Sequence, residues 1–163
     1  MKNKQILFLT QAALIAALYV VLTLISNVLG LASMQIQVRF SEALTILPYF
    51  TPAAIPGVFI GCLMSNLLAG GALLDIIFGS LATLLAAVLT YLLRRFKWLA
   101  PLPPIVCNTL IIPFVLKYAY GIIPLWLSFL TVCAGEIISA GVFGMLLLFT
   151  LQKYKKQIFF MNN

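Results

Sequence analysis

Residues 35–48, QIQVRFSEALTILP, contain the one close pair of opposite charges, Arg39 and Glu42, in a sequence made largely of long apolar runs. On a helix, side chains three residues apart lie on one face, near enough to pair with each other or with a ligand between them. An ionisable side chain near hydrocarbon costs about 2.5 to 3.5 kcal/mol on insertion scales. The stretch therefore predicts a functional site, and the apolar runs around it predict the bundle that holds the site.

Composition indicates the class of protein. Of the 163 residues, 64% are hydrophobic and 8% are charged, and the mean hydropathy is +1.16. Too little polar surface remains to cover a soluble globule, so we expect an all-α integral membrane protein with a single membrane domain over residues 1–163. The net charge of +7 does not indicate nucleic-acid binding, because the basic residues form short clusters beside apolar runs.

The sequence offers little for catalysis. Cys62, Cys107 and Cys133 each lie singly within apolar runs, and the chain has no histidine. Disulfide frameworks, zinc sites and histidine acid–base chemistry are therefore not expected. Paired carboxylates remain an option for acid–base catalysis or a proton relay. We expect no enzyme, no metal and no cofactor, and the absence of a Walker motif means that any ATP must be used by partner subunits.

Charges divide the chain into apolar stretches that predict six transmembrane helices. Their expected ranges are residues 6–31, 39–50, 53–69, 73–93, 105–118 and 124–152. The first is too long for the apolar core of a signal peptide, so it is expected to be retained. A polar loop or cap through Ser33, Gln35 and Gln37 should precede Arg39. The second helix rises only ~18 Å and must begin earlier, lie deep or be shielded by neighbours. A proline-rich link, Pro103 and Pro104 included, should precede the fifth helix, which Pro113 should interrupt.

The basic clusters predict the orientation. Those at residues 2–4, 94–97 and 153–156 fall on one side of a six-helix arrangement, so the positive-inside rule predicts cytoplasmic N- and C-termini. The other polar residues then face the outer half of the bundle: Arg39, Glu42, Asn66, Asp75, Lys117 and Glu136. Glu136, ~18 Å into the last helix, should lie near mid-membrane. Asn108 is the exception, expected near the cytoplasmic end. Together the outer residues predict a pocket for a small, flat, hydrogen-bonding ligand with apolar and aromatic walls.

Two patterns of small residues leave their roles open. Ala12, Ala13, Ala16 and Ala17 form overlapping small-xxx-small pairs on the first helix, which suit either packing within the bundle or docking to a partner subunit. Gly57 and Gly61 form a GxxxG pair that predicts close helix packing.

Asp75 also has a purely structural interpretation. A negative charge at a helix N-terminus interacts favourably with the helix dipole, so this acid could serve helix stability alone.

Several blocks, in order, resemble the QueT family. They are QVRFSEALTILP at residues 37–48, AAIPGVFIGCLMSNLL at 53–68, DIIFGSLATLLAA at 75–87, PIVCNTLIIP at 104–113, and the pair Gly135-Glu136. The resemblance covers about residues 11–149. It implies a substrate-binding S-component of an energy-coupling-factor (ECF) transporter, a type of ABC transporter, in a bacterial plasma membrane.

The implied ligand is a 7-deazaguanine queuosine precursor, with a 7-aminomethyl or 7-cyano group, captured from outside. The implied partners are a transmembrane coupling subunit and two cytoplasmic ATPases. Related S-components dock through an AxxxA face on the first helix, which favours the docking role for the four alanines.

A guanine edge presents adjacent N–H and NH₂ donors that one carboxylate can accept. We assign Glu136 to that edge and Asn66 to the carbonyl side. Either Glu42 or Asp75 would meet an aminomethyl tail, and Arg39 would orient Glu42. Two other functions remain open: an S-component for another heterocycle or vitamin, and a structural or assembly subunit in which Arg39 and Glu42 form a packing ion pair.

Overall fold

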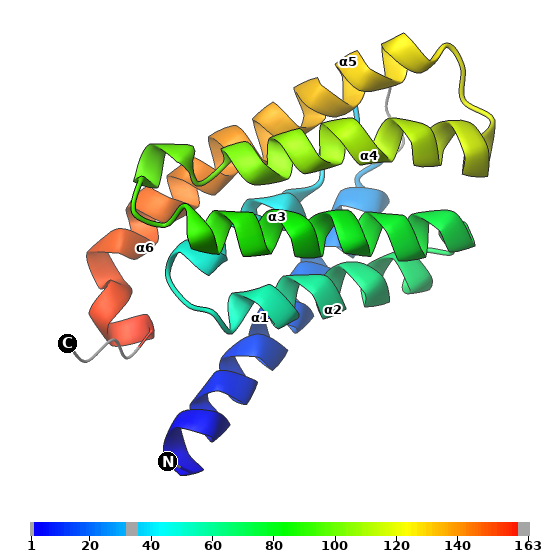
Figure 1. Ribbon diagram of the computed structural model, residues 1–163. Helices are drawn as coiled ribbons and strands as arrows, with labels where there is room; N and C mark the ends of the chain where they lie inside the picture. Colours follow the sequence, from blue (N-terminus) through cyan, green and yellow to red (C-terminus); the bar gives the residue numbers. More distant parts are fainter. Residues whose placement is uncertain (1, 32–35, 160–163) are drawn as a thin grey trace.

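The computed structural model describes residues 2–31 and 36–159, and all regular structure in them is helical (Figure 1). Ser33 and Gln35 of the expected polar loop lie outside the described residues, as do residues 1 and 160–163 of the expected domain. The elements are α1 (Lys2–Val28), η2 (Phe40–Tyr49), α2 (Ala54–Leu68), η3 (Asp75–Gly79), α3 (Ser80–Leu92), η4 (Lys97–Leu99), α4 (Leu102–Tyr120), α5 (Leu125–Glu136), η5 (Ile137–Phe143) and α6 (Gly144–Ile158). The all-α prediction is confirmed for these residues.

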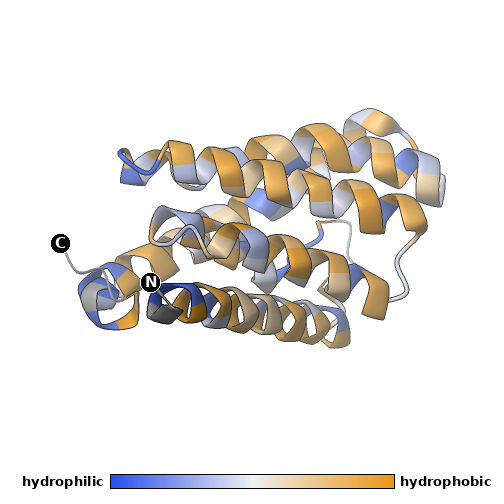
Figure 2. Cartoon of the chain, turned by 60° about the horizontal axis from the view of Figure 1, so that its bottom comes forward, coloured by the Kyte–Doolittle hydropathy of each residue, from blue (hydrophilic) through white to orange (hydrophobic). Residues whose placement is uncertain are grey.

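Within the described residues, four helices are long and apolar enough to cross a membrane. They are Lys4–Val28, Asp75–Leu92, Lys97–Tyr120 and Leu125–Lys155. Hydrophobic residues cover most of the length of each helix (Figure 2), and large ones such as Leu9 and Leu130 are more than 60% exposed. Such exposure is the pattern of a protein whose surroundings are lipid, so the chain is a membrane protein. The other two apolar segments, η2 and α2, are shorter, with 10 and 15 residues.

The stretch around Glu42 forms η2, a 3₁₀ helix whose residues 41–48 are all buried. Because 3₁₀ hydrogen bonds have poorer geometry than α-helical ones, so long a run depends on its surroundings. It packs against α1, α3 and α6. At its start, the backbone N–H of Phe40 donates to Ser26 Oγ (2.9 Å) and that of Arg39 donates to Ser139 Oγ (3.1 Å). This short element lies deep and is shielded by its neighbours.

Helices α1 and α2 approach closely through glycine. A Cβ on Gly57 would lie 2.9 Å from the Ala12 carbonyl oxygen, and one on Gly61 would lie 2.6 Å from Tyr19 Cβ. The GxxxG pair therefore serves close helix packing, as its spacing predicts. The contact also fixes Tyr19, which is 1% exposed. The N-terminal part of α1 extends away from the other helices (Figure 1).

Two proline expectations are wrong. Pro103 and Pro104 lie in the first turn of α4 and not in a link before it. Proline, which has no backbone N–H, is tolerated there because the N–H groups of a first turn have no hydrogen-bond partner within the helix. Helix α4 also continues through Pro113, which is buried. Neighbouring helices can stabilise a proline inside a membrane helix, so it need not end the helix. The helix ends instead at Gly121, whose φ of +67° is the left-handed conformation that favours glycine.

Candidate functional site

Two adjacent cavities lie between the helices. The inner cavity, of about 30 Å³, is lined by the polar side chains of Gln37, Arg39, Glu42, Thr83, Asn108 and Glu136. The outer cavity, of about 310 Å³, is lined by Asn27, Asn66, Asp75 and Tyr120, and it shares Gln37 and Arg39 with the inner one. A cavity of the inner size holds a water molecule or two, whereas the outer one reaches the range of small-molecule pockets.

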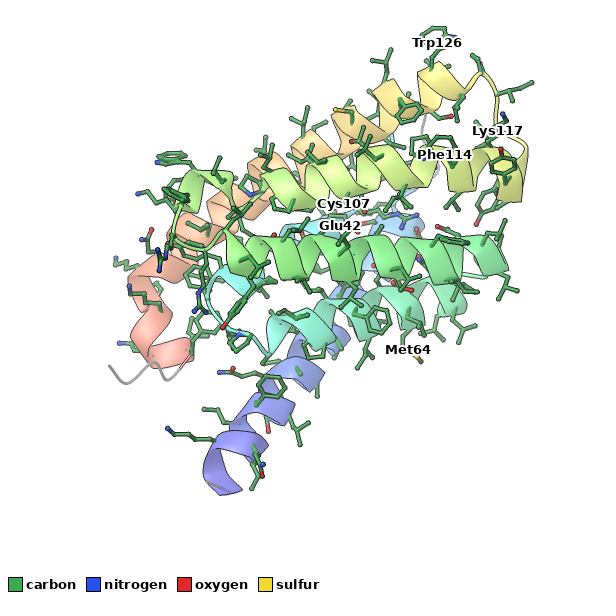
Figure 3. The ribbon with its side chains drawn as sticks, viewed as in Figure 1. Glu42, Met64, Cys107, Phe114, Lys117 and Trp126 are labelled. Carbon is green, nitrogen blue, oxygen red and sulfur yellow. The ribbon has the colours of Figure 1, made fainter. Side chains whose placement is uncertain are left out.

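Asn108 links two buried carboxylates in the inner cavity. Its Nδ2 donates to Glu136 Oε1 at 2.9 Å and to Glu42 Oε2 at 3.4 Å. Tyr19 Oη donates to the other Glu42 oxygen, Oε1. Glu42 is 3% exposed and Glu136 is 9% exposed, and Figure 3 shows Glu42 in the middle of the bundle. Four separate segments, α1, η2, α4 and α5, thus bring their polar groups to one point.

Two acceptor atoms of this network have no hydrogen-bond partner within the described residues. They are Glu136 Oε2 and Asn108 Oδ1, and both are buried. An unsatisfied buried polar group costs about 1–3 kcal/mol, so each one requires an explanation. Both belong to side chains that line the inner cavity. The arrangement suits a ligand that presents N–H donors to a carboxylate and a neighbouring amide oxygen.

Asp75 is the acid of the outer cavity, and Tyr120 holds it. Tyr120 Oη donates to Asp75 Oδ2 at 3.2 Å and accepts the backbone N–H of Ala72 at 3.0 Å. Asn66 Nδ2 donates to the Asp75 carbonyl oxygen at 3.4 Å. The end of α4 is therefore tied to the turn between α2 and α3, and the Asp75 carboxylate has a defined position.

A π-helical segment begins at Asp75 and another begins directly after Glu136, and a glycine lies close to each acid in the sequence. Asp75 begins η3, and Glu136 directly precedes η5; π-helical turns occur often at functional sites. A Cβ on Gly79 would lie 3.2 Å from both Asn66 Nδ2 and Asp75 Oδ1. One on Gly135 would lie 2.2 Å from the carbonyl oxygen of Gln37. Glycine at position 79 leaves room for Asn66 and Asp75 beside the inner cavity, and glycine at position 135 lets its helix approach the Gln37 backbone closely.

The structure brings most of the expected site residues together, with one exception. Arg39, Glu42 and Glu136 line the inner cavity, and Asn66 and Asp75 line the outer one. Lys117 lines neither; it is exposed, and its Nζ lies 5.5 Å from the centroid of the Tyr118 ring. Figure 3 shows it near the end of α4, away from Glu42.

Two residues of the inner network are missing from the sequence prediction. Asn108, expected near the cytoplasmic end, lies between Glu42 and Glu136. Its signal was an amide within an apolar run, a residue type that is rarely buried without partners. Tyr19 carries no such signal, because a tyrosine in a membrane helix also suits an interface. Among the described residues, the hydrogen bonds that hold the Glu42 carboxylate come from Tyr19 and Asn108 and not from Arg39.

The four alanines of α1 divide into two faces. Ala12 is 8% exposed, and its carbonyl oxygen faces Gly57 of α2. Ala16 is partly buried, and its carbonyl oxygen faces Gly61. Ala13 and Ala17 are exposed. One small-residue pair therefore packs within the bundle, and the other is open to a partner or to lipid.

Comparison with known proteins identifies the family. The family model described as QueT transporter matches residues 9–153, most of the chain. The chain is also 38% identical over 98 residues to a protein of Lactococcus lactis subsp. cremoris (strain MG1363), named queuosine precursor transporter QueT. That match covers 60% of this chain and 57% of the relative, so the chain spans just over half of that protein's length. No solved structure matches.

A match to a transporter family confirms the expectation of a transport protein that is not an enzyme. It also confirms the resemblance of the five sequence blocks, each of which contributes residues to the lining of the two cavities. The chain belongs to the QueT transporter family.

Proposed function

We propose that this protein is the substrate-capturing S-component of an ECF-type ABC transporter and that it binds a 7-deazaguanine queuosine precursor. The observation that carries the proposal is a pair of acceptors, Glu136 Oε2 and Asn108 Oδ1, that have no hydrogen-bond partner among the residues the structure describes and that lie beside the buried Glu42 carboxylate. Adjacent N–H and NH₂ donors on a guanine edge would satisfy these atoms. Membership of the family, and the printed name of the Lactococcus relative, support the same class of ligand.

The sizes of the two cavities suggest how such a ligand lies. The inner cavity is too small for a bicyclic heterocycle, whereas the outer one can hold it. The ring would therefore occupy the outer cavity and direct its donor edge past Gln37 toward Glu136. The exocyclic oxygen would then need a donor, and Asn66 and Arg39 offer N–H groups there.

Transport would follow capture. The chain would span the bacterial plasma membrane several times, with its basic clusters on the cytoplasmic side. A transmembrane coupling subunit and two cytoplasmic ATPases would supply ATP-driven movement. Because Ala12 and Ala16 pack against α2, the docking face would be the exposed pair Ala13 and Ala17.

Ala13→Trp is expected to abolish uptake in cells while leaving ligand binding by the purified protein within about threefold of wild type. The bulky ring would block a partner helix but meets no neighbour within the bundle, since Ala13 is exposed. Leu130→Trp, at a position 61% exposed on α5, is the control for an added lipid-facing tryptophan and should retain uptake. Loss of binding and uptake together in Ala13→Trp would instead make the alanine face a folding element.

The direct test of the proposed function is the ligand itself. Mass spectrometry of small molecules that co-purify with the protein should identify a 7-deazaguanine. Labelled 7-deazaguanine should bind to the purified protein and be displaced by guanine-like compounds but not by unrelated vitamins. A vitamin or other heterocycle in its place would support an S-component of different specificity. Absence of any small-molecule binding would support a structural or assembly subunit.

A further inference from the structure

The acidic residues of this basic chain are confined to one place. The sequence contains three Asp and Glu residues and ten Lys and Arg residues. All three acids, Glu42, Asp75 and Glu136, line the two cavities, and of the described basic residues Arg39 alone does so. Three carboxylates therefore face one guanidinium in a region shielded from water, where charges interact strongly. Acidic side chains therefore outnumber basic ones in this lining, which favours a ligand with a positive group.

Only one of the three acids is placed to meet such a group. Both oxygens of Glu42 already accept hydrogen bonds, and Glu136 faces an inner cavity of about 30 Å³. Asp75 lines the outer cavity, of about 310 Å³, and is itself only 8% exposed. A ligand substituent that points away from the Glu136 edge would therefore reach Asp75 first.

Tyr120 positions the Asp75 carboxylate for this contact. Its hydroxyl holds Asp75 Oδ2 at 3.2 Å while it is itself held by the Ala72 N–H at 3.0 Å. The other oxygen, Oδ1, lies next to Gly79, where a Cβ would approach it to 3.2 Å. Because Gly79 lines the inner cavity, the carboxylate stands where the two cavities meet.

Arg39 makes Asp75 necessary for a cationic ligand. The arginine lines both cavities, and its permanent positive charge repels any cation in the outer one. With Asp75 ionised, the outer cavity holds one charge of each sign. Without the Asp75 carboxylate, the Arg39 charge would be unbalanced in the outer cavity, and a cationic ligand would be repelled.

We propose that Asp75, positioned by Tyr120, makes the outer cavity select ligands that carry a positively charged substituent over neutral ligands of the same shape. This inference rests on the proposed function and sharpens its substrate class. Among the 7-deazaguanines, the aminomethyl compound is such a ligand, because a primary alkylamine is protonated near neutral pH as lysine is. The cyano compound is neutral, and its nitrile nitrogen is an acceptor that a carboxylate repels.

The test is the ratio of affinities for the two compounds, measured by equilibrium binding on the same preparation of purified protein. The wild-type protein should prefer the aminomethyl compound by at least tenfold, as expected for a hydrogen bond to a charged group. Asp75→Asn should reduce this ratio by about 10- to 100-fold. Asp75→Glu, which keeps the charge, should retain more of the preference than Asp75→Asn.

Because the ratio compares two ligands on one sample, a partly misfolded variant does not distort it. Thr90→Val removes a buried hydroxyl that bonds to the Ala100 carbonyl oxygen, outside both cavities, and should leave the ratio unchanged. Equal affinities in the wild type, a preference for the cyano compound, or an unchanged ratio in Asp75→Asn would overturn the inference while leaving the proposed function intact. Failure of both compounds to bind the wild type would overturn the proposed function as well.

Discussion

Replacing Glu136 with glutamine is expected to weaken binding of a 7-deazaguanine by about 10- to 100-fold without lowering the stability of the unliganded protein. The substitution keeps the shape of the side chain and an oxygen for Asn108 but removes the carboxylate oxygen, Oε2, that would accept an N–H donor of the guanine edge. In the unliganded protein Glu136 Oε2 is buried without a hydrogen-bond partner in the described residues. Replacing the carboxylate by a neutral amide removes the desolvation penalty of a buried charge, so the free energy of unfolding should stay equal or rise.

Equilibrium binding and thermal unfolding of the purified variant check both halves of this prediction. Thr90→Val loses a buried hydrogen bond that lies outside the cavities. Its ligand affinity should therefore be unchanged, while its free energy of unfolding should fall by about 1 kcal/mol. Wild-type affinity in Glu136→Gln would exclude a direct ligand contact at Glu136.

Glu42 should behave differently from Glu136, because both of its oxygens have partners. Glu42→Ala leaves the Tyr19 hydroxyl and one Asn108 contact without an acceptor, so both stability and affinity should fall, the former by about 1–3 kcal/mol. If Glu42→Ala and Glu136→Ala both bound ligand as the wild type does, the proposed site would be wrong.

Gly135→Ala is the second substitution for which we expect a large effect: loss of at least tenfold in affinity together with about 1–3 kcal/mol of stability. The added Cβ would lie 2.2 Å from the carbonyl oxygen of Gln37, a backbone atom that can move only if its whole segment moves. That segment carries the Gln37 and Arg39 side chains, which line both cavities.

Gly141→Ala is the matched control six residues further along the same helix. Its Cβ would meet Ile105 Cδ1 at 3.7 Å, an ordinary van der Waals contact. Affinity should therefore be unchanged, and stability should stay equal or rise slightly because alanine reduces the entropy of the unfolded chain. Equal affinities for the two variants would contradict the role assigned to the Gln37 backbone.

Much of the site follows from the cost of polar groups in an apolar chain. Glu42, Asp75 and Glu136 could be selected from the sequence because a carboxylate in hydrocarbon is retained only where it has a use or a partner. The same reasoning cannot separate Lys117 from them, since a lysine near a helix end can reach water. It also overlooks Tyr19, whose role depends on the glycines of α2 that bring it against Glu42.

The sequence by itself determined that this is an all-helical membrane protein of the QueT family, and it named the acids of the candidate site, because composition and the cost of burying charge depend on residues alone. The tertiary structure decided that residues 40–49 form a buried 3₁₀ helix, that the site has two cavities, and that Asn108 joins Glu42 to Glu136. These features depend on how distant segments pack. Whether a buried oxygen such as Glu136 Oε2 has a partner is settled only when those segments meet.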